Sequence, residues 1–156
     1  MALQLGDRAP DFSLPDGEGN TVSLADLHGK WVVLYFYPRD NTPGCTKEAC
    51  AFRDAYADFQ SSDVVVLGVS TDDAKSHTKF TTKFNLPFPL LTDADGAMAT
   101  TYDSYGLKKF MGKEYMGISR KTFIIDPDGN IAKIYPKVKP EQHAAEVLAD
   151  LATLKG

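Results

Sequence analysis

The segment WVVLYFYPRDNTPGCTKEAC, residues 31–50, contains the strongest local signals of the chain. Its first part, residues 31–38, is a continuous apolar run rich in β-branched and aromatic residues, which is typical of a strand buried on both faces. A turn that contains proline and glycine follows it, and apolar residues at helical spacing occupy 46–60. We therefore expect a buried strand, a short loop and a helix that begins near Cys45.

The rest of the chain repeats this alternation of strand and helix. Apolar runs predict strands at 64–70, 122–126 and 131–136, with a turn at DPDGN between the last two. Apolar spacing predicts helices at 73–84, 95–104 and 139–154. The segment LPDGEGNTVSLADL, residues 14–27, resembles a hairpin that leads into a short turn. The pattern predicts an α/β fold whose mixed central sheet is flanked by helices, with an N-terminal hairpin extension.

Composition limits the kinds of partner. The 156 residues fit one domain, 1–156, because no repeat or linker divides them. The net charge of −4 argues against a nucleic-acid or anionic-membrane partner, and no apolar run approaches the roughly 20 residues of a membrane span. The N-terminus, MALQLGDRAPDFSLPD, lacks the basic and apolar regions of a signal peptide, so we expect a cytoplasmic location.

The chain has two cysteines, Cys45 and Cys50, and their spacing excludes the common motifs. Two thiols without a nearby histidine or a second pair do not make a four-ligand zinc site, and C-x-x-C is absent. We expect neither a metal nor a cofactor. Cys45 would lie in the first turn of a helix just past the carboxyl end of a strand, where free backbone N–H groups and the helix dipole favour the reactive thiolate.

The position of Cys50 restricts how the two thiols can meet. Five residues along a helix give a rise of about 7.5 Å and a rotation of about 140°, whereas a disulfide needs Cα atoms within roughly 7 Å. The pattern therefore leaves open two unrelated thiols, with Cys50 a small buried apolar residue, or a pair that bonds only after a local conformational change.

A resemblance to a known protein family indicates what the two cysteines do. The segment YPRDNTPGCTKEACAFRD, residues 37–54, resembles the active-site segment of the peroxiredoxins, which are thiol peroxidases with a thioredoxin-like fold. Their signature P-x-x-x-T/S-x-x-C is filled by Pro38, Thr42 and Cys45, and the second cysteine resembles the bacterioferritin comigratory protein, or peroxiredoxin Q, subgroup. The likeness continues through residues 6–38 and through FMGKEYMGISRKTFIIDPDG, which contains Arg120.

The resemblance implies a role for each matching residue. Cys45 would be the peroxidatic cysteine that attacks a hydroperoxide and becomes a sulfenic acid. Thr42 would hydrogen-bond the sulfur and the peroxide, Arg120 would stabilise the thiolate and the leaving oxygen, and Pro38 would shield the sulfur from water. Cys50 would be the resolving cysteine, which forms an intramolecular disulfide with Cys45.

The same resemblance implies the reaction's partners. Hydrogen peroxide and organic hydroperoxides would be substrates in antioxidant defence, thioredoxin would be the reductant, and glutaredoxin is chemically possible as well. A monomer is expected, because resolution needs only one chain. A redox sensor that acts through a partner protein is the alternative function, and a structural or chaperone domain with inert thiols is a third.

Plainer interpretations exist for single residues. Arg120 could be a surface charge, Thr42 a helix cap and Pro38 the end of a strand. Glu48 resembles a family position that braces the arginine, although a solvated helix carboxylate has the same appearance. Phe110, Met111 and Tyr115 fit either the path of the peroxide or an exposed loop with apolar anchors, and no role is assigned to His28, His77 and His143.

Overall fold

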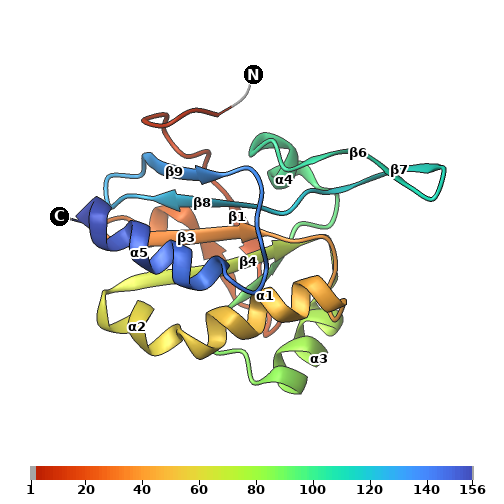
Figure 1. Ribbon diagram of the computed structural model, residues 1–156, viewed down its shortest axis with the longest axis horizontal. Coiled ribbons are helices and arrows are strands. Elements are labelled where there is room, and N and C mark those ends of the chain that lie inside the picture. The colour runs from red at the N-terminus through yellow and green to blue at the C-terminus, as the bar shows by residue number, and fades with distance from the viewer. Residues whose placement is uncertain (1–2, 156) are drawn as a thin grey trace.

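The computed structural model describes residues 3–155 as an α/β fold (Figure 1). The N-terminal part contains β1 (Ser13–Pro15), β2 (Thr21–Ser23) and the short 3-10 helix η1 (Leu24–Leu27). Next come β3 (Trp31–Phe36), α1 (Pro43–Asp54), α2 (Tyr56–Ser61), β4 (Val64–Ser70), α3 (Ala74–Phe84) and β5 (Leu90–Thr92). The C-terminal part contains α4 (Ala97–Thr101), β6 (Tyr105–Phe110), β7 (Lys113–Ile118), β8 (Lys121–Ile125), β9 (Ile131–Tyr135) and α5 (His143–Lys155).

The central sheet is mixed, as the sequence predicted. Its strand order is β5-β4-β3-β8-β9. β3, β4 and β5 are parallel, whereas β8 runs antiparallel to β3 and β9 antiparallel to β8. β1 and β2 pair as the predicted N-terminal hairpin. The loops that follow β3 and β4 therefore leave the sheet at the same edge, which is where functional groups collect in such sheets.

Alternation along β3 divides the core into two layers. Val33 and Tyr35 point to the face that α1, α3 and α5 cover, together with Phe52 and Val147. Val32, Leu34 and Phe36 point to the opposite face, which the N-terminal segment and α4 cover. A strand buried on both faces explains why residues 31–38 read as a continuous apolar run.

Three predicted helices differ in extent. The helix expected at 46–60 is two helices, because the backbone at Ala55 leaves the helical region (φ −96°, ψ 2°) and α2 restarts at Tyr56. The helix expected at 95–104 is only Ala97–Thr101. The helix expected at 139–154 begins only at His143, and its last predicted residue, Leu154, is 37% exposed. No helix in residues 3–155 is long and apolar enough to cross a membrane.

The sequence did not predict the short strand β5 or the hairpin β6–β7. The hairpin pairs Tyr105 with Ile118 at its base and projects from the body of the protein in Figure 1. Met111 and Tyr115 are exposed, as the loop interpretation expected, but they belong to a hairpin and not to a loop, and the side chain of Phe110 lies outside what the structure describes. The apolar side chains Leu107 and Met116 of the hairpin are exposed, so the alternation that marks a half-buried strand does not appear in the sequence.

Candidate active site

Cys45 lies in the first turn of α1, just past the carboxyl end of β3. Thr42 is the N-cap residue in an extended conformation, and Pro43 opens the helix, where its missing N–H costs nothing. Asn41 adopts a left-handed conformation (φ 58°), which asparagine tolerates and which turns the loop toward the helix. The Cys45 side chain is only 2% exposed, so its sulfur faces the interior.

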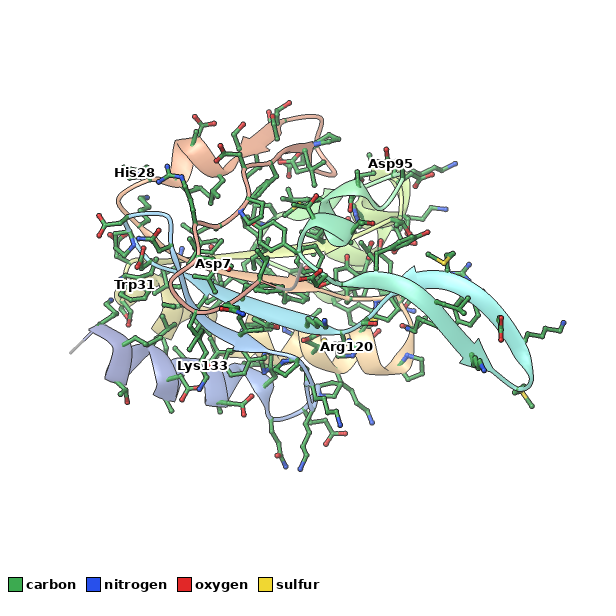
Figure 2. The ribbon with its side chains drawn as sticks, turned by 90° about the horizontal axis from the view of Figure 1, so that it is seen from above. Asp7, His28, Trp31, Asp95, Arg120 and Lys133 are labelled. Atoms are coloured by element: carbon green, nitrogen blue, oxygen red, sulfur yellow. The ribbon has the colours of Figure 1, made fainter. Side chains whose placement is uncertain are left out.

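The sulfur of Cys45 accepts a hydrogen bond from an arginine that lies far away in the sequence. Arg120 Nη2 donates a hydrogen bond to Cys45 Sγ at 3.4 Å, and Arg120 Nη1 donates to Glu48 Oε1 at 2.8 Å. Figure 2 shows Arg120 where the hairpin joins the body of the protein, far from Trp31 at the start of β3. One guanidinium thus bridges a thiol and a carboxylate on α1, and a thiolate in this place would gain a charge-assisted hydrogen bond.

Gly44 makes room for this guanidinium. A Cβ atom at position 44 would lie 2.9 Å from Arg120 Nη2, which is closer than real Cβ contacts. An added Cβ would therefore displace the end of Arg120, so the small size of glycine at this position leaves room for the guanidinium.

Burial strongly affects the ionisable groups around the sulfur. Burial raises the pKa of Glu48 from 4.5 to about 7, although the charge and hydrogen bond of Arg120 oppose the change. Burial opposes the charged form of Arg120, but Cys45 and Glu48 together raise its pKa above the ordinary value. Burial and the charge of Arg120 lower the pKa of Lys108, and Cys45 opposes this. Arg120 therefore remains a cation beside the thiol.

Two polar atoms near the site have no hydrogen-bond partner among the described residues. They are Glu48 Oε2 and the hydroxyl of Tyr35. Tyr35 is fully buried and its ring stacks on Phe52 with centroids 4.9 Å apart. Burial, with the charges of Glu48 and Cys45, raises the pKa of Tyr35 well above its usual value. Ionised Glu48 is thus held in an environment that satisfies only one of its oxygens.

The structure places Thr42 and Pro38 beside the cysteine loop. The Thr42 hydroxyl donates to the backbone carbonyl of Arg39 at 2.9 Å. Pro38 and Arg39 line a hollow of about 390 Å³ together with the base of the hairpin, including Tyr105 and Ile118. Tyr115 lines it as well, whereas Met111 and Cys45 do not, so the role of Tyr115 in the peroxide path stays a prediction.

Cys50 lies on the same uninterrupted helix as Cys45. Both thiols are free, and Cys50 is partly exposed whereas Cys45 is buried. α1 runs without a break from Pro43 to Asp54, so the helical geometry that keeps the thiols apart applies to both.

A buried network that the sequence did not reveal anchors the loop before Cys45. Asp40 accepts hydrogen bonds from the hydroxyls of Tyr37 at 2.5 Å and Ser76 at 2.8 Å, and its Oδ2 lies 2.7 Å from His77 Nδ1. His77 Nε2 lies 3.0 Å from the carbonyl oxygen of Leu91. His77 was assigned no role, because no local pattern links it to a residue 37 positions away.

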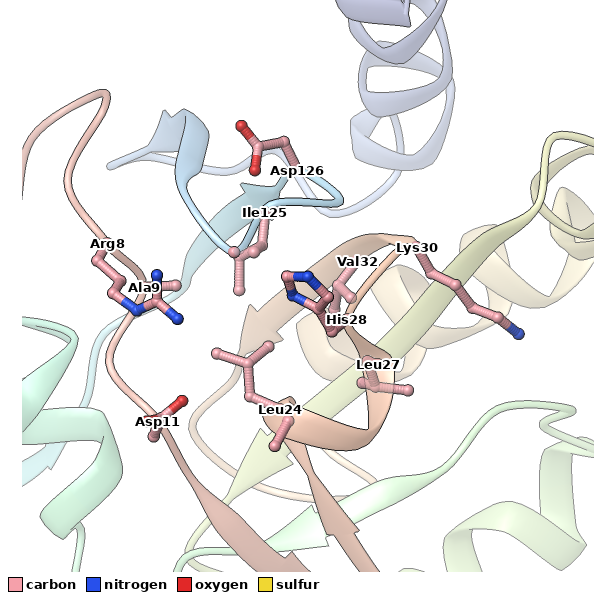
Figure 3. Close-up of a pocket in the computed structure, with 12 residues that line it drawn as sticks. Arg8, Ala9, Asp11, Leu24, Leu27, His28, Lys30, Val32, Ile125 and Asp126 are labelled. Atoms are coloured by element: carbon pink, nitrogen blue, oxygen red, sulfur yellow. The ribbon is translucent and has the colours of Figure 1, made fainter.

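A separate pocket of about 220 Å³ lies at the other end of β3 (Figure 3). Leu24, Val32 and Ile125 form its apolar floor, and Arg8 and His28 stand at its rim. None of the predicted site residues lines it. In the described part of the chain, no cluster of three histidine, cysteine, aspartate or glutamate side chains could hold a metal ion.

Comparison with known proteins agrees with this geometry. Residues 5–134 match the AhpC/TSA family. The chain is 50% identical to a putative peroxiredoxin Bcp of Coxiella burnetii over 97% of this chain and 100% of that protein. It is also 50% identical to peroxiredoxin Bcp of Bacillus subtilis, over 97% of this chain and 96% of that protein.

Solved structures give the same result. A cysteine-to-serine mutant of PrxQ from Xylella fastidiosa matches with a TM-score of 0.94 and 34% identity, covering 100% of this chain and 99% of that one. The bacterioferritin comigratory protein of Xanthomonas campestris, studied for its alkyl peroxide reduction activity, matches with a TM-score of 0.91 and 36% identity over 98% of both chains.

Proposed function

The chain belongs to the AhpC/TSA family and is a thiol peroxidase of the peroxiredoxin class, and from this we propose that Cys45 and Cys50 carry its reaction cycle. Hydrogen peroxide and organic hydroperoxides are the substrates. The organic substrates are supported by the alkyl peroxide reduction activity named for the Xanthomonas campestris relative. The observation that carries the assignment is the hydrogen bond from Arg120 Nη2 to Cys45 Sγ.

In the first step, the Cys45 thiolate attacks the terminal oxygen of the hydroperoxide. The S–O bond forms while the O–O bond breaks, so Cys45 becomes a sulfenic acid, and the leaving oxygen takes a proton to give water or an alcohol. Arg120 stabilises the thiolate before the attack and the negative charge on the leaving oxygen during it. Glu48 holds the guanidinium in place through the bond at 2.8 Å.

Thr42 and Pro38 complete the site. Thr42 occupies the N-cap position of α1, three residues before Cys45, and its hydroxyl is proposed to turn from the Arg39 carbonyl toward the sulfur and the bound peroxide. Pro38 borders the hollow beside the hairpin and is proposed to keep water from the sulfur. Both roles rest on position within the loop and on the family signature.

In the second step, Cys50 resolves the sulfenic acid. The Cys50 sulfur attacks the Cys45 sulfur, a disulfide forms and water leaves. Because α1 separates the thiols while it is intact, this step requires the helix to open between Pro43 and Cys50. A dithiol reductant, which we propose to be thioredoxin, then restores both thiols by exchange, and glutaredoxin is the alternative reductant.

A monomer is proposed, since both cysteines of the cycle belong to one chain. The cycle also needs a compartment whose thiol reductants regenerate the free cysteines, for which we propose the cytoplasm.

The test compares Cys45→Ser, Cys50→Ser and the wild type after one equivalent of hydrogen peroxide. The wild type should lose two hydrogen atoms in its intact mass as the disulfide forms, and Cys50→Ser should gain one oxygen atom at Cys45. Cys45→Ser should show neither change and no turnover. Normal turnover by Cys45→Ser, or a disulfide-free cycle in the wild type with thioredoxin, would contradict the proposal.

A further inference from the structure

The outer face of α3 carries a row of lysines beside the cysteine loop. Lys75, Lys79 and Lys83 follow one another at intervals of four residues, so they lie on one face of the helix, and all are exposed. α3 contains no acidic residue, although the whole chain has a net charge of −4. The three lysines edge a hollow of about 540 Å³ that Asp40 and Asn41 close on the side of the cysteine loop.

The positive charge of this hollow is not cancelled within the described part of the chain. None of the three lysines makes an ion pair there, and like charges four residues apart destabilise a helix. Asp73 lines the hollow and caps α3 by accepting from the Ser76 backbone N–H at 2.8 Å. Besides Asp40, the three lysines therefore share the hollow with one carboxylate, that of Asp73, and the carboxylate of Asp72 binds the backbone of Asp40 without lining the hollow.

The second carboxylate of the hollow, Asp40, adds no net charge. The Leu91 carbonyl can only accept, so His77 Nε2 must donate to it. The short contact from His77 Nδ1 to Asp40 Oδ2 then needs one proton between the two atoms. Whichever atom holds that proton, the pair is neutral overall, and the hollow keeps its excess of positive charge.

The same bonds fix the lysines relative to the cysteine loop. Ser76 and His77 on α3 both bind Asp40, and Lys83 Nζ lies 3.4 Å from the side-chain oxygen of Asn41. The backbone N–H of Asp40 is held in turn by Asp72 at 2.7 Å. On the side of the cysteine loop, these contacts involve only Asp40 and Asn41, which precede α1, so we expect them to stay intact when α1 opens. The charged hollow therefore stays beside the point where the Cys45–Cys50 disulfide emerges.

We propose that this hollow, bordered by Lys75, Lys79 and Lys83, is the docking surface for the protein that reduces the disulfide, and that it recognises an acidic surface next to the partner's dithiol. The proposal rests on the proposed reaction cycle. Its physical basis is charge complementarity, which steers association and acts mainly on the association rate. A small uncharged dithiol needs no such surface, so the two kinds of reductant can be separated by experiment.

The test uses a charge reversal on α3 and a matched reversal elsewhere. The variant is Lys75→Glu/Lys79→Glu. Position 75 lies in the first turn of α3, where the helix dipole favours a carboxylate, and a carboxylate at position 79 lies four residues before Lys83, which also favours the helix. The control is Lys30→Glu/Lys155→Glu, two exposed lysines away from the hollow that change the net charge equally. Peroxide turnover is measured with a bacterial thioredoxin, its reductase and NADPH, and separately with dithiothreitol.

The α3 variant should lose about tenfold or more in kcat/KM for thioredoxin at low ionic strength, a size typical of steering effects. The loss should shrink as salt is added, because the screening length falls to about 3 Å at 1 M. Turnover with dithiothreitol and the rate of Cys45 oxidation should match the wild type. The control should behave as the wild type with both reductants.

Equal thioredoxin kinetics in the α3 variant and the wild type would overturn the proposal. An equal loss in the control would also overturn it, since the effect would then come from total charge. A loss with dithiothreitol would show a defect in the thiols themselves and count against docking. If the wild type consumes no peroxide with either reductant, the proposed cycle fails, and this result is distinct from a docking failure.

Discussion

Replacing Glu48 with glutamine should remove a pH dependence of stability that its burial creates. Burial raises the pKa of Glu48 from 4.5 to about 7 in the folded protein, so the folded state keeps a proton that the unfolded chain has already lost. Wherever the folded state binds more protons, the free energy of unfolding falls as the pH rises. Stability from this group is therefore highest near and below pH 4.5, falls up to about pH 7 and is constant above it.

The size of the effect follows from the two pKa values. The difference between 4.5 and about 7 corresponds to about 3 kcal/mol, at about 1.4 kcal/mol for each pH unit. Glu48→Gln stays neutral at every pH and its carbonyl can still accept from Arg120 Nη1. Relative to the wild type, the free energy of unfolding of the variant should therefore rise by about 3 kcal/mol as the pH rises from about 4.5 to 8.

The assay is urea unfolding of both proteins at several pH values in this range. His143 acts in the opposite direction, because burial lowers its pKa and this contribution to stability rises with pH. The quantity to compare is therefore the difference between the two proteins at each pH, from which His143 cancels. A difference that does not change with pH would refute the reasoning, since Glu48 would then be equally ionised in both states.

Three further changes test the geometry. Gly44→Ala should push the flexible end of Arg120 away from the sulfur. The rate of Cys45 oxidation, measured by stopped-flow fluorescence, should fall about tenfold or more, while the free energy of unfolding should change little. Asp40→Ala should destabilise the protein by about 1–3 kcal/mol, because His77 loses its partner. Asp40→Asn should be less destabilising, because its amide can donate to His77. Equal losses of stability for the two variants in urea unfolding would contradict this. Oxidation to the disulfide should raise hydrogen exchange at residues 43–50 and not in the strands, and unchanged protection would contradict helix opening.

The parts of the fold that could be predicted from sequence are those with strong local signals. The central strands were found because burial on both faces makes continuous apolar runs, and 64–70 coincides with β4. β5 was missed because its three residues give too short a pattern. The hairpin β6–β7 was missed because exposed apolar residues hide its alternation, and the break at Ala55 was missed because apolar spacing continues across it.

The site was predictable to a different degree for each residue. Cys45 could be placed in the first turn of a helix from the strand, proline and glycine before it. Arg120 lies 75 positions from Cys45, so only the family resemblance brought the two together. The pair of His77 and Asp40 had no local signal at all, because each residue alone reads as an ordinary polar side chain.

The burial of Glu48 affects the free energy needed to open α1. Opening the helix between Pro43 and Cys50 removes Cys45, Glu48 and Ala49 from the interior, since all three are almost fully buried. Exposure of Cys45 and Ala49 costs apolar burial, but both side chains are small. Exposure of Glu48 lowers the free energy of opening near neutral pH, because the buried site disfavours its ionised form by about 3 kcal/mol. Phe52, stacked on Tyr35, lies beyond the opened segment and keeps the rest of the helix docked. The carboxylate that holds Arg120 against the sulfur in the closed helix thus lowers the free energy needed to open it once Cys45 is oxidised.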